Sequence, residues 1–282
     1  MQALLRKSMS IYTLAREAGA RKVRRGRFEL MRLSRPGERL DASMQREMLF
    51  AFAKETDLIY QADTSFHWLS RKDYFAGIED LWLVFLDREL VGFTGIRLFY
   101  GADEKIVYID NMNIRSIPLL VADRHTLGSM LVHEILRANY PRSVPPMSVV
   151  FRTQNPSVYR LAQAILPPAV YPRMDPSTVR DEERCRRVLG FMAQTLSPGK
   201  VFECDVSVIR RAYGGHIYGR PMSSPISIKP VLANFWKEHV SLENGDAVLI
   251  AVCPTHPEVR GLVDTYARTL IRWMRRVRGP RI

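Results

Sequence analysis

Three stretches in the middle of the chain decide the fold, namely residues 106–114 (IVYIDNMNI), 126–139 (TLGSMLVHEILRAN) and 147–155 (MSVVFRTQN). The first and the third begin as apolar runs of strand length, and each predicts a strand. The second has apolar residues at spacings of three and four, which predicts a helix over about residues 127–139 that Pro141 ends. The segment therefore predicts a strand, a helix and a second strand in succession.

Two further apolar runs lie toward the N-terminus, at residues 81–86 and 91–100, and they predict strands. Tight turns join these runs to one another and to the strand at 106–114, so an antiparallel meander is expected. Outside the meander we expect a strand over 27–33 and helices over 2–20, about 43–54 (with Asp41 as N-cap) and about 71–78.

Toward the C-terminus, helical and strand patterns continue to alternate. Helices are expected over 156–166, about 177–196 and about 228–239, with strands over 201–209 and 247–252 and a final amphipathic helix. The fold class expected from this order is α+β, a mixed central sheet with flanking helices. We expect a single domain over residues 27–257, with insertions near 167–200 and 210–245, between a basic N-terminal helix (1–26) and a basic C-terminal helix (258–282).

Charge is concentrated at the two ends of the chain. The 282 residues include 42 Lys and Arg against 29 Asp and Glu, a net charge of +13. Residues 1–27 carry +7 and residues 258–282 carry +5, which leaves +1 for the middle. Such clustering indicates an anionic partner, and nucleic acid, an anionic membrane surface and an acidic carrier protein all stay open. Solvated basic faces without a partner are the plain alternative.

The composition excludes several classes of protein. A hydrophobic content of 46% is that of a globular chain rather than a disordered one. No apolar run approaches the ~18 residues of a membrane span. The three scattered cysteines, Cys185, Cys204 and Cys253, argue against a disulfide framework or a cysteine-rich zinc site. A cytoplasmic location is therefore expected.

Most nucleophile, phosphate-loop and metal motifs are absent from the sequence. Residues 127–131 lack the second glycine of G-x-S-x-G, and the chain has no Walker A lysine and no G-x-G-x-x-G. His133 and Glu134 begin an H-E-x-x-H pattern, but Arg137 occupies the fifth position. No metal and no permanently bound cofactor is expected.

A phosphate site is expected where the helix at 127–139 begins. Free backbone N–H groups at a helix N-terminus bind phosphate, and glycine lets a ligand approach closely. Thr126, Leu127, Gly128 and Ser129 form such an N-terminus, preceded by Arg124.

This stretch, together with the order of the elements around it, resembles the Gcn5-related N-acetyltransferase (GNAT) superfamily over about residues 27–166. The family's pyrophosphate loop has the form Q/R-x-x-G-x-G/A. Gly128 matches its last glycine, whereas Thr126 and Asp123 replace the first glycine and the Gln/Arg. The resemblance implies that residues 124 and 126–129 contact the pyrophosphate of coenzyme A.

A second family motif places an Asn at the end of the next strand and a Tyr seven residues later. Asn155 matches the Asn, but Ala162 stands at the Tyr position and Tyr159 lies one turn earlier. By this resemblance Asn155 belongs to the cofactor site and Tyr159 is a candidate acid for the leaving thiolate. A partly buried helix tyrosine is the alternative for Tyr159.

The strand at 106–114 supplies the remaining candidates. Tyr108, Asp110, Met112 and Ile114 share one face of it. Asp110 is the candidate general base, because an aspartate is uncommon in a strand and an attacking amine must lose a proton. A structural salt bridge is the alternative role for Asp110. By analogy with the family, the backbones of Met112 and Ile114 would meet the pantetheine arm.

The first functional hypothesis is transfer of an acyl group from an acyl-CoA or acyl-carrier-protein thioester to an amine on a small molecule. The alternative is a catalytically altered GNAT-like module that binds tRNA or an acidic protein through its basic ends. A GNAT enzyme acting on aminoacyl-tRNA is a third, weaker hypothesis. The sequence leaves the acyl chain and the acceptor open.

Overall fold

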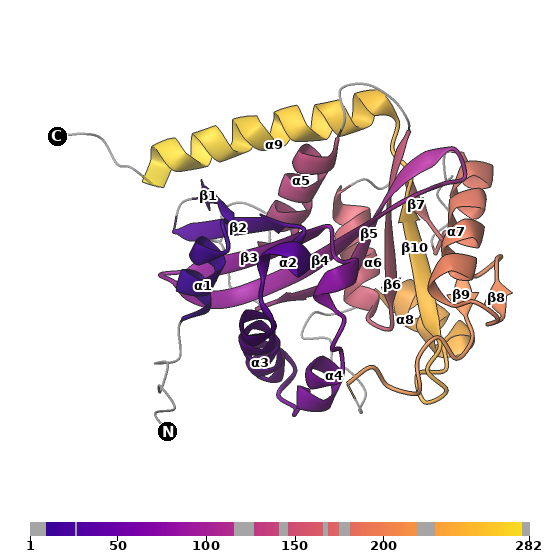
Figure 1. Cartoon of the computed structure of the whole chain (residues 1–282). Coiled ribbons are helices and arrows are strands. Elements are labelled where there is room, and N and C mark those ends of the chain that lie inside the picture. The colour runs from indigo at the N-terminus through magenta and orange to yellow at the C-terminus, as the bar shows by residue number, and fades with distance from the viewer. Residues whose placement is uncertain are drawn as a thin grey trace. The chain divides into compact units, whose positions relative to one another are not determined.

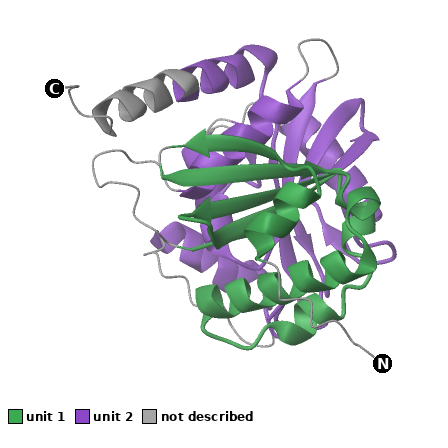
Figure 2. Cartoon of the chain, turned by 60° about the vertical axis from the view of Figure 1, so that its left-hand side comes forward, with its two compact units in different colours: residues 1–97, 111–115, 272–282 green, residues 98–110, 116–271 purple. Residues whose placement is uncertain are grey.

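A computed structural model describes residues 10–25, 27–115, 127–140, 146–165, 169–174, 181–218 and 229–277, with side chains up to residue 266. The chain forms two compact units (Figure 2). Unit 1 comprises residues 1–97, 111–115 and 272–282, and unit 2 comprises residues 98–110 and 116–271. Strands β4 (Glu89–Gly101) and β5 (Glu104–Ile114) contribute residues to both units.

Unit 1 is built on antiparallel strands in the order β1-β2-β3-β4. Register pairs such as Leu30 with Val84 and Leu83 with Phe93 align buried side chains across them. Its elements are α1 (Ile11–Glu17), β1 (Arg21–Arg25), β2 (Phe28–Ser34), α2 (Pro36–Arg39), α3 (Ala42–Tyr60), α4 (Ser65–Leu69), a 3-10 turn (Phe75–Gly77) and β3 (Asp80–Leu86).

An aromatic cluster forms the core of unit 1. Helices α1, α3 and α4 pack their apolar side chains on one face of β2, β3 and β4. Phe52 of α3 stacks on Phe93 of β4, with ring centroids 3.9 Å apart. Trp68 of α4 meets both rings edge-on and donates its indole N–H to Thr56 at 2.9 Å. This hydrogen bond satisfies the one polar atom of a fully buried tryptophan.

Unit 2 contains the remaining strands, in the order β5-β6-β10-β9-β8, with β7 paired to β10 (Figure 1). Strands β5 and β6 are parallel and the other pairs are antiparallel, so the sheet is mixed. Its elements are α5 (Leu127–Asn139), β6 (Met147–Thr153), α6 (Pro156–Ile165), β7 (Val170–Tyr171), α7 (Glu182–Leu196), β8 (Phe202–Glu203), β9 (Val208–Ile209), α8 (Pro230–His239), β10 (Ala247–Val252) and the part of α9 (His256–Val277) up to residue 271.

Helix α7 covers one face of the strands of unit 2. Its side chains Val188, Leu189 and Met192 pack with Val150 of β6 and Leu249 of β10 in one buried cluster. The residues that alternate with these point to the other face and are also buried. Both faces of β6 and β10 are therefore covered, as near-continuous apolar runs predict.

The predicted fold class is confirmed, because a mixed sheet with flanking helices is what forms. The strand–helix–strand segment also forms as expected, since β5, α5 and β6 lie within two residues of the predicted bounds. None of the helices that the structure describes is long and apolar enough to cross a membrane.

Three local predictions are wrong. Within residues 10–20, helix α1 covers only Ile11–Glu17, and Arg21–Arg25 is a strand paired to β2. The helix expected near 71–78 is replaced by α4 and a 3-10 turn. The strand expected over 201–209 is two short strands around a turn, because Ser207 adopts a φ of 57°. The division into segments 1–26, 27–257 and 258–282 stays a prediction.

Candidate functional site

The candidate site lies where the parallel strands of unit 2 stop pairing. The register of β5 with β6 runs from Lys105 and Met147 to Ile109 and Phe151. The next residues along the two strands are Asp110 and Arg152.

Asp110 and Arg152 belong to one face of the sheet. Tyr108 is aligned with Val150, and Asp110 and Arg152 follow them two residues later. Alternation along a strand therefore gives all four side chains the same face. Asp110 and Arg152 are both half-buried, and the charge of Asp110 acts on Arg152.

The Arg152 guanidinium is fixed by its surroundings in unit 2. Its Nη1 donates to the carbonyl oxygen of Leu196 at 3.2 Å and to Ser197 Oγ at 3.0 Å. Its central carbon lies 4.8 Å from the ring centroid of Tyr213, which is a cation–π distance. Burial by itself lowers the pKa of Arg152, but Tyr213, Tyr108 and Asp110 raise it, so the net pKa is raised and Arg152 stays charged.

Tyr213 is held over Arg152 by a close approach of two backbone segments. Its backbone N–H donates to the Gly245 carbonyl at 2.9 Å, and its hydroxyl donates to the Arg152 carbonyl at 3.4 Å. Gly245 has a φ of 80°, and a Cβ there would lie 2.1 Å from the Tyr213 carbonyl oxygen. Only glycine fits both the space and the conformation.

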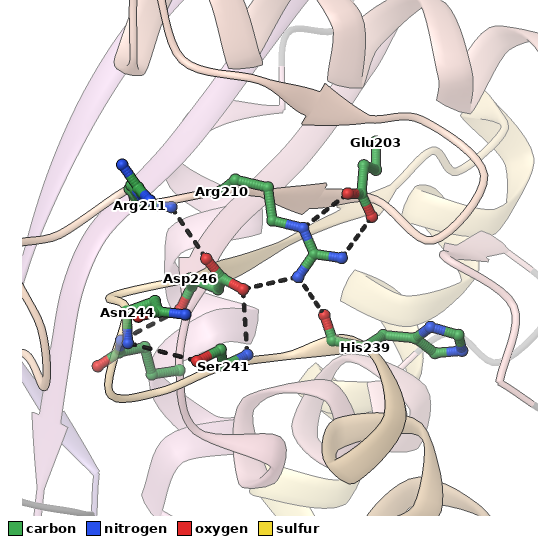
Figure 3. A network of polar contacts seen from close by, with 8 residues as sticks. Glu203, Arg210, Arg211, His239, Ser241, Asn244 and Asp246 are labelled. Carbon is green, nitrogen blue, oxygen red and sulfur yellow. Dashed lines mark hydrogen bonds and ion pairs between the residues drawn. The ribbon is translucent and has the colours of Figure 1, made fainter.

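A network of charges connects the two ends of the segment 210–246, which carries Tyr213 and helix α8 (Figure 3). Arg210, next to β9, donates through Nε and Nη2 to Glu203 at 2.7 and 2.6 Å and through Nη1 to Asp246 at 2.6 Å. Asp246, next to β10, also accepts from the backbone N–H groups of Arg211 at 2.9 Å and Ser241 at 3.1 Å. The network therefore fixes both ends of residues 210–246 to the sheet.

Asp246 is almost completely buried, with 2% of its surface exposed. Burial raises the pKa of this carboxyl, but the hydrogen bonds from Arg211, Arg210 and Ser241 lower it more, so the net pKa is below its ordinary value. Asp246 is therefore charged at neutral pH and accepts the hydrogen bonds as a carboxylate.

Gln154 connects the end of β6 to the same loop. Its amide nitrogen donates to the carbonyl oxygens of Gly215 at 3.2 Å and Asp246 at 3.1 Å, and its amide oxygen accepts from Ile217 N–H at 2.9 Å. Gln154 is only 3% exposed, and these bonds satisfy a buried amide. The loop is thereby positioned beside the strand end that bears Arg152.

The predicted phosphate site is described only in part. Arg124 and Thr126 lie outside the described residues. In α5, Leu127 is buried, Gly128 is half-buried and Ser129 is 8% exposed. The contact of these residues with a pyrophosphate stays a prediction.

Asn155 and Tyr159 have structural partners in and around α6. Asn155 Oδ1 accepts from the Ser157 N–H at 2.9 Å, which satisfies a free donor at the start of the helix. Tyr159 is 3% exposed, and its hydroxyl accepts from the Met174 N–H at 3.3 Å. Their proposed roles in catalysis and cofactor binding stay predictions.

A pocket of about 450 Å³ lies beside Tyr159. Its apolar lining includes Ala164 of α6, Leu232 of α8 and Met174, which follows β7, and its cations are Arg160 and Lys229. Apolar walls with a few charged groups suit a ligand that combines a hydrocarbon part and an anion.

Met112 and Ile114 belong to unit 1. Both are half-buried on β5, where a Cβ added to Gly92 would lie 3.1 Å from Ile114. Their contact with a pantetheine arm stays a prediction.

Arg152 and Tyr213 are the residues that sequence reasoning missed. Arg152 interrupts the apolar run of β6, at the residue that follows the last pair with β5. An arginine within an otherwise buried strand is the signal that could have identified it. Tyr213 gave no such signal, because only the fold brings residue 213 to residue 152. Among the described residues, no group of three or more His, Cys, Asp or Glu could hold a metal ion.

No family model and no curated protein matches the chain. A solved structure of Arabidopsis thaliana Naa50 in complex with the bisubstrate analogue CoA-Ac-MVNAL is similar at 13% identity, over 61% of this chain and 70% of that chain, with a TM-score of 0.26.

Proposed function

We propose that the chain is an N-acyltransferase that moves an acyl group from a thioester, an acyl-CoA or an acyl carrier protein, to an amine on a small molecule. The observation that carries the proposal is the position of Asp110 directly after the last residue pair of the parallel strands β5 and β6. Helix α5, with Gly128 in its first turn, follows β5 in the chain. A helix N-terminus suits a diphosphate. The diphosphate of the acyl donor and the general base Asp110 would then meet at one end of this strand pair.

Asp110 would act as the general base. An ammonium group cannot attack a carbonyl carbon, so it must first lose a proton, which a carboxylate accepts directly or through a water. The amine then forms the new C–N bond, the C–S bond breaks, and the thiolate leaves with the electron pair. Tyr159 is the candidate that returns a proton to the sulfur.

The pocket beside Tyr159 supports a donor with a hydrocarbon chain. Its walls at Ala164, Met174 and Leu232 are apolar. An acetyl group would leave most of the 450 Å³ unfilled, whereas a longer acyl chain would bury apolar surface there.

The test is an assay of thiol release with acetyl-CoA and a long-chain acyl-CoA, in the presence of mixed amine acceptors. Asp110→Asn is expected to slow transfer by about 10²–10⁴-fold with little change in thermal stability, because a general base contributes on that order. Asp103→Asn, in the exposed turn before β5, is the matched control and should leave the rate unchanged. Full activity of Asp110→Asn would show that Asp110 has a structural role and is not the general base.

A second variant tests the donor site. Gly128→Phe is expected to block the start of α5 and to abolish the thermal stabilisation by acyl-CoA, which should reach about 2.7 kcal/mol at a hundredfold excess over the Kd. Unchanged stabilisation of this variant would remove α5 from the donor site. If tRNA stabilises the wild-type chain and no thioester does, the result would favour the second candidate function, described below.

The second candidate function is binding of nucleic acid or an acidic protein, and the edge position of β1 favours it. This strand begins the sheet order, and its sequence is RKVRR. Arg21 and Arg24 are exposed on it. A cytoplasmic location fits either function and is proposed with both.

A further inference from the structure

A pocket of about 210 Å³ lies in unit 1, among α1, α3 and the hairpin of β3 and β4. Its apolar walls include Ile11, Leu58 and Leu90. Leu58 is 55% exposed, and Ile11 and Leu90 are half-buried. A ligand that enters the pocket would therefore remove apolar surface from water.

Both carboxylates that line this pocket are already paired. Arg115 donates through Nε and Nη2 to the two oxygens of Glu55 at 2.8 and 2.7 Å, and through Nη1 to Glu89 at 2.8 Å. Glu55 is only 3% exposed, so a buried two-point ion pair fixes this wall. An incoming anion would meet these two carboxylates as members of ion pairs and not as free charges.

Two other cations line the pocket, Lys54 on α3 and Arg88 in the turn between β3 and β4. Both are exposed, and neither forms a hydrogen bond or an ion pair with a residue that the structure describes. The central guanidinium carbon of Arg88 lies 5.7 Å from the ring centroid of Tyr12, which also lines the pocket. Asp87, the acid next to Arg88, is paired with Arg27 at 2.8 Å.

The charges and the size of the pocket indicate the class of ligand. Its lining holds three cations, Lys54, Arg88 and Arg115, against the two carboxylates, which leaves one positive charge. A single negative charge balances this excess, whereas a phosphate monoester would bring about two. The volume is below the ~300–1,000 Å³ of sites for drug-sized ligands, so the apolar part of the ligand must be small.

We propose that unit 1 binds a small monocarboxylate with a hydrocarbon chain. Lys54 and Arg88 would hold the carboxylate by charge-assisted contacts, and the walls at Leu58 and Leu90 would bury the chain. This site is a second one, independent of the acyl transfer proposed above.

Isothermal titration calorimetry of the full chain with octanoate tests the proposal. Acetate, which lacks the chain, and octan-1-ol, which lacks the charge, are the matched probes. Octanoate is expected to bind at millimolar concentration or below, and each probe at least about tenfold more weakly, since each lacks one of the two recognised parts. The absence of octanoate binding, or equal affinity for either probe, would overturn the proposal.

Variants of the lining separate the charge from the space. Lys54→Gln and Arg88→Gln should each weaken octanoate binding by about three- to tenfold, the range for exposed charge-assisted contacts. Ala51→Phe should abolish binding, because it fills the pocket without changing its charge. Arg46→Gln removes an exposed cation of α3 that does not line the pocket, and it should keep the wild-type affinity. Unchanged affinity in both Lys54→Gln and Arg88→Gln would overturn the proposal.

Octanoate could also enter the pocket beside Tyr159, where Lys229 is one of the cations. Lys229→Gln tells the two pockets apart, and it should leave binding in unit 1 unchanged. Binding that is lost in Lys229→Gln and kept in Lys54→Gln and Ala51→Phe would place octanoate beside Tyr159 and overturn the proposal. The titration contains no thioester and no amine, so its outcome does not depend on whether the chain transfers acyl groups.

Discussion

At the scale of single residues, Gly245 is the described glycine of unit 2 that combines a positive φ with the closest approach to an added Cβ. Its positive φ is strained for any L-residue, and its missing Cβ makes room for the Tyr213 carbonyl. Two separate reasons therefore require glycine, conformation and space. They can be told apart because Gly199 has almost the same φ, 75°, with nothing within 4 Å of an added Cβ.

Gly199→Ala is expected to lower the free energy of unfolding by about 1 kcal/mol, from backbone strain alone. Gly245→Ala should lower it by about 3 kcal/mol or more, because two backbone segments must also move apart. It should also displace Tyr213 from its position over Arg152. Urea unfolding of the three proteins measures the costs, and equal costs for the two variants would contradict the argument from space.

At the scale of elements, Asp246 links the ends of β9 and β10. The stability that this link contributes depends on pH. The folded state lowers the pKa of Asp246 below its ordinary value of 3.8. A depressed carboxyl pKa stabilises the fold above the ordinary value, and this contribution is lost as the pH falls through the folded pKa. The carboxylate form is therefore the one that holds the loop.

Asp246→Asn should be less stable than the wild-type chain at pH 7, since an amide cannot accept all of these hydrogen bonds. The difference should shrink as the pH falls from about 5 to 2, because the wild-type carboxyl takes up a proton over that range. Measuring the free energy of unfolding at several pH values checks this. A difference that stays constant with pH would show that the charge of Asp246 is unimportant.

At the scale of the whole molecule, the net charge of +13 makes some affinity for nucleic acid expected whatever the function. The question is whether the basic edge strand β1 forms a specific surface. Arg21→Gln with Arg24→Gln removes two charges from that strand. Arg35→Gln with Arg187→Gln removes two exposed charges elsewhere and leaves the same net charge.

If β1 contacts phosphates, the first pair of substitutions should reduce the salt dependence of tRNA binding by about 0.7–0.9 in log–log slope for each lost contact. The control pair should change the slope much less. Filter binding of tRNA between 50 and 200 mM salt measures both. Equal changes would mean that only net charge matters, and the nucleic-acid function would lose its support from β1.

The sequence by itself determined the α+β class, because hydrophobic periodicity and turn residues act locally. It also located β5, α5 and β6 and identified Asp41 as an N-cap, whose side chain accepts from the Met44 N–H at 2.8 Å. It misassigned Arg21–Arg25, since strand pairing to β2 outweighs a helical local pattern.

Only the tertiary structure decided what surrounds Asp110. Asp110, Arg152 and Tyr213 are far apart in the chain and come together through parallel strand pairing and through a loop fixed by Asp246. The pairing of distant strands and the position of Tyr213 cannot be predicted from a local sequence pattern. The sequence therefore named a candidate base, and the fold supplied the cation that lies beside it.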